Sequence, residues 1–155
     1  MVDAAPSSAD LRRLMQRLFR RFGALSSDRT PCGKPLPMGY AHGLMVLLGG
    51  DAMSQQELGR ELCIDKSNVA RLCAKMAESG HVVQRADATD GRIRRVSLTP
   101  KGEALAREVD AASSARFGDL LDALPRNRRA SVVAALGELV RAVEALPAAD
   151  ERNVS

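Results

Sequence analysis

Residues 54–105 read SQQELGRELCIDKSNVARLCAKMAESGHVVQRADATDGRIRRVSLTPKGEAL and carry the strongest structural signals in the chain. Ser54 and Glu57 have the spacing of a capping box, which starts a helix. Asp65 can cap a second helix, and Gly80 is placed to stop it in the left-handed conformation. Two short helices joined by a tight turn predict a helix-turn-helix.

The second half of this stretch predicts a hairpin and then a long helix. Residues 82–85 and 93–98 are strand-like runs, separated by the polar residues 86–92. Thr99 followed by Pro100 favours a helix start, because the hydroxyl can cap the helix and the proline lacks only an N–H that would stay unbonded there. The predicted order is helix-turn-helix, hairpin wing, long helix.

Apolar residues recur at helical spacing on both sides of residues 54–105. They predict a first helix over 11–25, capped by Ser7 and Asp10, a short buried helix over 40–48, and a last helix over 132–146 after Pro125 interrupts the long one. The prolines within 31–37 exclude a helix there. The predicted fold is mainly α with a small β wing: a winged helix-turn-helix plus N- and C-terminal dimerisation helices.

This pattern divides the chain into four parts. We predict that residues 1–35 form an N-terminal dimerisation helix and loop, and that residues 36–100 form a winged helix-turn-helix DNA-binding domain. We predict that residues 101–147 form C-terminal dimerisation helices and that residues 148–155 form a flexible tail. We expect a homodimer, because one small winged domain cannot cover all the apolar stripes of the first and last helices.

Composition excludes several classes of protein. A chain of 155 residues with 45% hydrophobic and 27% charged residues is typical of a folded globular protein. It has no apolar run of the ~20 residues that a membrane span needs, and its start is too charged for a signal peptide, so we expect a cytoplasmic protein. The absence of Trp and an aromatic content of 3% disfavour the stacking platforms of single-strand binders.

The second helix of the pair has a polar face suited to DNA. A helix of this size fits the major groove of B-DNA, where an amide can pair with adenine and an Arg can pair with guanine. Any amphipathic helix has a polar outer face, so this signal alone leaves a merely solvated face equally open. The outward positions hold Lys66, Ser67, Asn68, Arg71 and Lys75.

The hairpin strengthens the DNA hypothesis. Between Arg85 and Arg95 it carries four arginines, which include Arg92 and Arg94, against two aspartates, a local charge of +2. The narrow minor groove attracts an Arg at the tip of such a wing. The alternative is a solvated hairpin whose charges serve solubility.

Residues 54–105 resemble the winged helix-turn-helix of the MarR (multiple antibiotic resistance regulator) family of bacterial transcription factors. Asp90-Gly91-Arg92 is similar to the D-x-R tip of that family's wing, and residues 96–102, VSLTPKG, are similar to the segment that leads into its long helix. The resemblance over residues 54–105 covers about a third of the chain. The flanking helices agree with the family plan in order and periodicity.

The resemblance implies a homodimer that binds a palindromic operator in double-stranded DNA. It implies also that a small ligand or an oxidant releases the DNA by acting from a cleft between the dimerisation and DNA-binding parts. Ser67, Asn68 and Arg71 match recognition-helix positions, Arg92 matches the wing arginine, and Asp90 matches its supporting partner. Gly91 departs from the family pattern, which often has a second Arg there, and Arg94 can supply the missing contact.

The three cysteines allow a redox hypothesis. Cys63 and Cys73 are expected to be small buried hydrophobes, whereas Cys32 lies in a Pro/Gly loop near Lys34, where a positive neighbour favours the thiolate. Cys32 is therefore the candidate redox sensor, with an unreactive loop thiol as the alternative. We expect His81 to pack at the base of the wing, and the spacing of Cys32, His42 and the acids predicts no metal site.

The leading hypothesis is a sequence-specific DNA-binding regulator, a repressor that a ligand or thiol oxidation releases. The sequence holds no nucleophile beside a base, no Gly-rich phosphate loop and no paired carboxylates at a strand end, so we expect no enzyme and no cofactor. The alternative is a winged-helix module for architecture or protein contacts, without a specific operator or effector.

Overall fold

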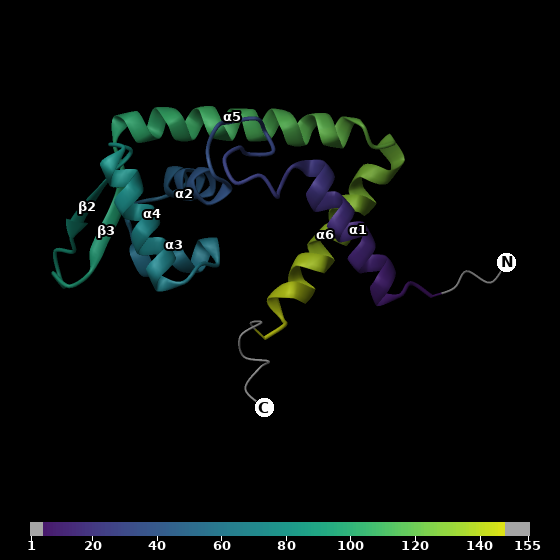
Figure 1. The fold of residues 1–155 in the computed structure, drawn as a ribbon, viewed down its shortest axis with the longest axis horizontal. Helices are drawn as coiled ribbons and strands as arrows, with labels where there is room; N and C mark the ends of the chain where they lie inside the picture. The colour runs from purple at the N-terminus through teal and green to yellow at the C-terminus, as the bar shows by residue number, and fades with distance from the viewer. Residues whose placement is uncertain (1–4, 148–155) are drawn as a thin grey trace. The chain divides into compact units, whose positions relative to one another are not determined.

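The computed structural model describes residues 5–147 of the chain and is mainly helical (Figure 1). It has six α-helices, one 3-10 helix and a small antiparallel sheet of three strands within these residues. The predicted fold class, mainly α with a β wing, is confirmed. The elements in chain order are α1 (Ser8–Phe22), α2 (Met38–Leu48), β1 (Met53–Ser54), α3 (Gln55–Leu62), α4 (Lys66–Glu78), β2 (Val82–Ala86), β3 (Arg94–Leu98), α5 (Pro100–Asp122), η1 (Arg126–Arg128) and α6 (Arg129–Glu144).

The predicted helix starts are confirmed by their hydrogen bonds. Ser54 and Glu57 form the capping box of α3, in which the Ser54 backbone N–H donates to Glu57 Oε2 at 2.7 Å. Asp65 caps α4 by accepting from the backbone N–H of Asn68 at 2.8 Å. Thr99 Oγ1 accepts from the backbone N–H of Gly102 at 3.0 Å where α5 begins. Each bond satisfies a donor that the first turn of a helix leaves free.

The sheet has the strand order β1-β3-β2. Its hairpin pairs Val82 with Leu98 and Ala86 with Arg94, while Met53 of β1 pairs with Val96 on the other side of β3. The sequence predicted the hairpin but not β1, because two residues are too few to show an alternating pattern. Strand β1 therefore joins the wing to the start of α3.

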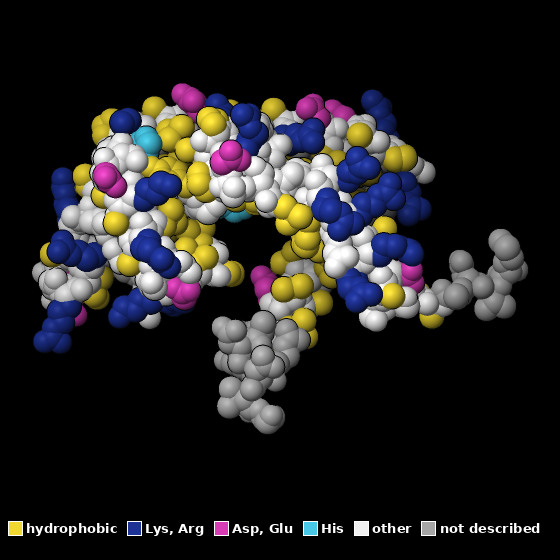
Figure 2. Space-filling model, in the orientation of Figure 1, with side chains coloured by type: hydrophobic (Ala, Val, Ile, Leu, Met, Phe, Trp, Pro, Cys, Tyr) yellow, Lys and Arg dark blue, Asp and Glu magenta, His cyan; other side chains and the backbone are white. Residues whose placement is uncertain are grey.

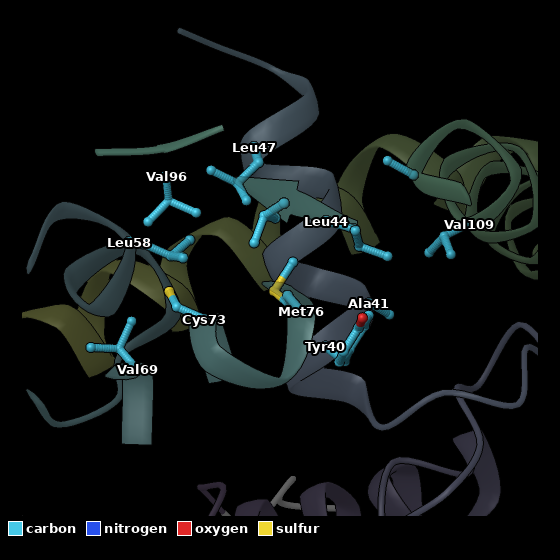
Figure 3. Close-up of a cluster of buried hydrophobic side chains, with 12 residues drawn as sticks. Tyr40, Ala41, Leu44, Leu47, Leu58, Val69, Cys73, Met76, Val96 and Val109 are labelled. Atoms are coloured by element: carbon cyan, nitrogen blue, oxygen red, sulfur yellow. The ribbon is translucent and has the colours of Figure 1, made fainter. Parts of the chain in front are cut away.

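One apolar core holds together the winged part of the chain, which runs from α2 to the first half of α5 (Figure 3). Helix α2 lies at its centre and contributes four buried hydrophobic residues, as expected for a short buried helix. The helix-turn-helix, the sheet and the first half of α5 surround it. The buried hydrophobic residues are Tyr40, Ala41, Leu44, Leu47, Leu58, Val69, Cys73, Met76, Val82, Val96, Ala106 and Val109.

The base of the wing meets the start of α5 at close range. The backbone N–H of Thr99 donates to the His81 carbonyl at 3.0 Å, and the Thr99 hydroxyl donates to the Gly80 carbonyl at 2.6 Å. A Cβ atom on Gly102 would lie 1.8 Å from the His81 carbonyl oxygen. Only glycine therefore allows α5 to begin this close to the start of β2.

The chain divides into two compact units at Arg116 and Phe117. In the second unit, as far as it is described, the end of α5, η1 and α6 follow one another, and Arg129 bonds Asp122 at 3.1 Å. Neither α1 nor α6 has a buried residue. Large apolar side chains of this region, such as Phe117, Leu136 and Val140, are about half exposed in the single chain.

Two remaining points are the predicted C-terminal tail and the search for membrane-spanning helices. The tail predicted over residues 148–155 lies outside the described residues. Within residues 5–147, no helix combines the length and the apolar character that crossing a membrane would require.

Candidate nucleic-acid interface

Helix α4 separates its apolar and polar residues cleanly. Val69, Cys73 and Met76 are buried in the core. All five predicted contact residues are exposed on the other side of the helix: Lys66, Ser67, Asn68, Arg71 and Lys75. The face that would enter a major groove is therefore free of the core.

A chain of hydrogen bonds joins the N-cap of α4 to Arg71. Arg71 donates to Asn68 Oδ1 at 2.7 Å, and Asn68 Nδ2 donates to Asp65 Oδ2 at 2.6 Å. The backbone N–H of Asn68 is the main cause that lowers the pKa of Asp65 below its usual value, and the Arg71 charge adds to it. Asp65 thus stays ionised and orients the amide and the guanidinium, the two groups that can read bases.

The wing tip exposes Arg92 and Arg94. Asp90, the expected support of Arg92, accepts a hydrogen bond from the Arg92 backbone N–H at 3.0 Å. This hydrogen bond stabilises the turn of the wing. It involves the backbone of Arg92, so it does not fix the position of the Arg92 guanidinium. The backbone N–H of Ile93 donates to the Asp90 carbonyl at 3.0 Å, so the turn extends one residue further than predicted and β3 begins at Arg94.

Sequence reasoning missed the side chains that hold the wing in place. Arg95 donates from Nε to Asp87 Oδ2 at 2.7 Å and from Nη1 to Glu57 Oε2 at 3.1 Å. Arg95 is one of the four arginines of the wing, but it pairs with Glu57 of α3 and Asp87 and is therefore not a free cation. Arg95 and Asp87 are eight residues apart in the sequence, and the strand register of the hairpin brings them into contact. Strand β1 brings Glu57 close to Arg95.

The Asp87 carboxylate has several hydrogen-bond donors. The Arg95 guanidinium is the main cause that holds the pKa of Asp87 far below its ordinary value, and the Thr89 hydroxyl and the backbone N–H groups of Thr89 and Asp90 lower it further. Hydrogen bonds to the charged form favour ionisation. The wing is therefore organised around an ionised Asp87 across the neutral pH range.

A cavity of about 610 Å³ lies between the turn that joins α3 to α4 and the wing. It corrects the expectation for Cys63, which is exposed and lines this cavity. Cys63 ends α3 in the left-handed conformation (φ 53°), outside the apolar stripe, so its side chain does not enter the core. The other lining residues are Ser54, Gln55, Gln56, Gly59, Arg60, Ile64, Lys66, Val69, Arg92, Ile93 and Arg94.

The other two thiols differ from each other. Cys73 is buried as predicted, and burial raises the pKa of its thiol. Cys32 is half-buried, with its sulfur 3.0 Å from Thr30 Oγ1. Lys34, the expected positive neighbour, forms an ion pair with Glu108 at 3.5 Å.

His81 packs at the base of the wing, as predicted. The Tyr40 hydroxyl and His81 Nδ1 share a hydrogen bond of 2.6 Å, which links α2 to the start of β2. Burial, followed by the nearby Lys101 charge, lowers the pKa of His81. Among residues 5–147, no three His, Cys, Asp or Glu side chains are grouped so that they could hold a metal ion.

Charge is distributed unevenly over the described part of the chain. Helix α1 holds five exposed arginines and one aspartate. Its formal net charge of +4 equals that of the whole chain. Figure 2 shows Lys and Arg side chains both along α1 and over the wing. The winged part thus has no large excess of positive charge. Its exposed basic groups lie at the tip of the wing and on α4.

The exposed α4, the basic wing and the long helix behind them define a winged helix-turn-helix protein. Residues 37–93 match the model of the MarR family, which confirms the resemblance seen in the sequence motifs. This match spans α2, the helix-turn-helix and most of the wing.

Solved structures share the fold over most of the chain. A probable transcriptional regulator from Pseudomonas aeruginosa has a TM-score of 0.71 at 23% identity, covering 83% of this chain and 96% of that one. BpsR from Bordetella bronchiseptica, whose DNA binding is regulated by 6-hydroxynicotinic acid, has a TM-score of 0.68 at 21% identity, covering 90% and 96%. The transcriptional repressor CouR, bound to a 23-mer DNA duplex, has a TM-score of 0.66 at 22% identity, covering 86% and 92%.

Proposed function

We propose that this protein is a transcriptional regulator that binds a palindromic operator as a homodimer and acts as a repressor. The observation that carries the proposal is the exposed polar face of α4 beside the exposed arginines of the wing tip, on a part of the chain that matches the MarR family. CouR, a repressor of the same fold, binds duplex DNA. Residues 36–100 serve as the DNA-binding domain and contact DNA through Lys66, Ser67, Asn68, Arg71, Lys75, Arg92 and Arg94.

The homodimer is supported by the apolar faces that one chain leaves uncovered. In α6, Val133, Leu136, Val140 and Val143 repeat along one side and are 49–61% exposed. In α1, Leu11, Leu14, Leu18 and Phe19 are 44–59% exposed. Monomeric proteins rarely leave such contiguous apolar surface in water. A second copy provides a matching surface, and its two-fold axis suits a palindromic site.

Release by a small organic acid is the form of regulation that the fold neighbours favour. BpsR responds to 6-hydroxynicotinic acid. Thiol oxidation is the second form, and Cys32 is the proposed sensor because its half-buried thiol lies in a Pro/Gly loop two residues from Lys34. If Cys32 is the sensor, Cys32→Ser keeps DNA affinity and abolishes release by peroxide, whereas an equal peroxide response in both proteins removes the redox form.

The test of the proposed function is a binding titration against promoter fragments near the protein's own gene, over a series of salt concentrations. A specific site is expected to bind at least ~10³-fold more tightly than random DNA at equal salt. Equal affinity for every fragment would favour an architectural module, which binds phosphates without reading bases. No binding at low salt would favour a module for protein contacts.

A further inference from the structure

Helix α1 separates five arginines from its apolar residues (Figure 2). On a helix of 3.6 residues per turn, Arg13, Arg17 and Arg20 lie within about 60° of one another. Arg12 and Arg21 flank them, and all five side chains are exposed. We call these five residues the arginine face of α1. The other side of the helix holds the apolar residues Leu11, Leu14, Met15, Leu18, Phe19 and Phe22.

The arginine face has few neutralising partners. Among residues 5–147, Arg13 pairs with Asp10 at 2.9 Å, and the other four arginines have no carboxylate within ion-pair distance. Like charges three or four residues apart, such as Arg13, Arg17 and Arg20, repel and weaken a helix. Arg20 and Arg21 lie in the last turn, where the helix dipole favours cations, but the other three have no such role. Anions bound to this face would relieve the repulsion.

Most of the net charge of the chain lies in its first segment. Residues 1–35 have seven basic and three acidic side chains, a formal net charge of +4, and five of the seven basic ones are in α1. Residues 36–100, the proposed DNA-binding domain, have eight basic and seven acidic side chains, a net charge of +1. Attraction to the phosphates drives sequence-independent binding to DNA. The nearly neutral winged domain supplies little of that attraction, whereas α1 can supply much of it.

The arginine face suits the backbone of a duplex. From Arg12 to Arg21 the helix rises about 14 Å, a length over which one strand of B-DNA presents about four phosphates. Each guanidinium can donate two parallel hydrogen bonds to one phosphate. Phe19 and Phe22 lie on the apolar side of α1, so the arginine face has no ring on which an unpaired base could stack.

We propose that the arginine face of α1 is a second DNA-binding surface, which holds duplex DNA by its phosphates without reading the sequence. It is separate from the α4 and wing surface that the proposed function uses to recognise an operator. A basic amphipathic helix can also lie on an anionic membrane, but it then buries its apolar side in the lipid. The preference for DNA rests on the proposed homodimer, in which a second copy covers that apolar side and leaves the arginine face free.

The test measures how tightly the full chain binds a fluorescein-labelled duplex of random sequence, by fluorescence anisotropy over a series of salt concentrations. The α1 variant, Arg17→Gln/Arg20→Gln/Arg21→Gln, removes three charges and keeps residues that favour a helix. It is expected to bind the random duplex at least about tenfold more weakly. The slope of log affinity against log salt concentration is expected to fall by up to about three units, about one for each lost phosphate contact.

A matched control removes the same charge elsewhere. Arg126→Gln/Arg128→Gln/Arg141→Gln changes three exposed arginines of the second unit, and its affinity for the random duplex is expected to change less than about twofold, because salt screens distant charges. Equal weakening in both variants would show an effect of net charge alone and would overturn the α1 surface. Light scattering and circular dichroism compare the mass and helix content of both variants with those of the unmodified protein.

A second measurement needs no variant and therefore does not depend on how the variants fold. Phenylglyoxal modifies exposed arginines, and the modified positions are mapped by mass spectrometry of peptides. The random duplex is expected to slow the modification of Arg17, Arg20 and Arg21 and to leave the rates at Arg126 and Arg128 unchanged. The same rates at α1 with and without the duplex would overturn the proposal.

The remaining outcomes separate this proposal from the alternatives. Vesicles that contain phosphatidylglycerol test the membrane: the proposal is overturned if the α1 variant loses vesicle binding and keeps its affinity for the random duplex. Weaker binding of random DNA by the α1 variant of a protein that finds no operator supports the α1 surface and refutes the proposed function. Specific operator binding, with random-DNA affinity unchanged in the α1 variant, refutes the α1 surface alone.

Discussion

Arg71 and Arg92 offer DNA two different kinds of contact. Arg71 presents a planar donor fork on α4, oriented through Asn68, and can pair with guanine O6 and N7. Arg71→Ala is therefore expected to cost about 1–3 kcal/mol on the operator and little on random DNA. Arg92→Ala is expected to weaken binding to the operator and to random DNA more evenly. It is also expected to reduce the slope of log affinity against log salt concentration by roughly one unit. Salt-series titrations measure both effects, and unchanged operator affinity in both variants would refute this DNA surface.

Asp87 makes the wing sensitive to acid. Because its pKa is lowered from 3.8 in the folded protein, mainly by Arg95, its contribution to stability is complete above pH 3.8 and is lost as the pH falls further. Asp87→Asn is thus expected to lower Tm at pH 7, and the deficit is expected to be smaller at pH 3 but still present, because the pKa of Asp87 in the folded protein lies well below that pH. Thermal unfolding at both pH values tests this. Asp51→Asn is the control, because this exposed carboxylate forms no side-chain hydrogen bond or ion pair within residues 5–147. A deficit that persists unchanged at pH 3 would count against the Asp87–Arg95 pair.

At the scale of elements, one glycine decides how the long helix joins the wing. The His81 carbonyl beside Gly102 already accepts from Thr99, so it cannot move away freely from a new methyl group. Gly102→Ala is expected to destabilise the fold by roughly 1–3 kcal/mol through overpacking. Gly39→Ala in α2 has open space around its new Cβ and is expected to be neutral or to stabilise by about 0.5–1 kcal/mol. Urea unfolding measures the free energy of unfolding of both variants. Equal effects would show that the junction between α5 and β2 can shift to accommodate the new methyl group.

At the scale of the whole molecule, the uncovered apolar helices predict the assembly. Light scattering is expected to give twice the 16.6 kDa of the chain at micromolar concentration. Leu136→Glu is expected to weaken the dimer at least about a hundredfold, because the side chain is lost from both copies of a symmetric interface. Glu138→Gln, on the same helix, is the control. A mass of one chain at high concentration would refute the homodimer.

The elements of the winged part could be predicted from local sequence because their signals are local. Caps, apolar periodicity and turn residues act within a few positions, so Ser54, Asp65 and Thr99 marked helix starts that the structure confirms. The outward positions of α4 followed from the same periodicity.

Other features depended on contacts between distant residues. Arg95 looked like a free wing cation until the strand register placed it beside Asp87 and strand β1 brought Glu57 to it. The sequence predicts a buried Cys63 because it stands beside the apolar Leu62, and only the left-handed end of α3 places it at the cavity. A cavity is bounded by segments far apart in the chain, so it arises only when tertiary packing brings them together.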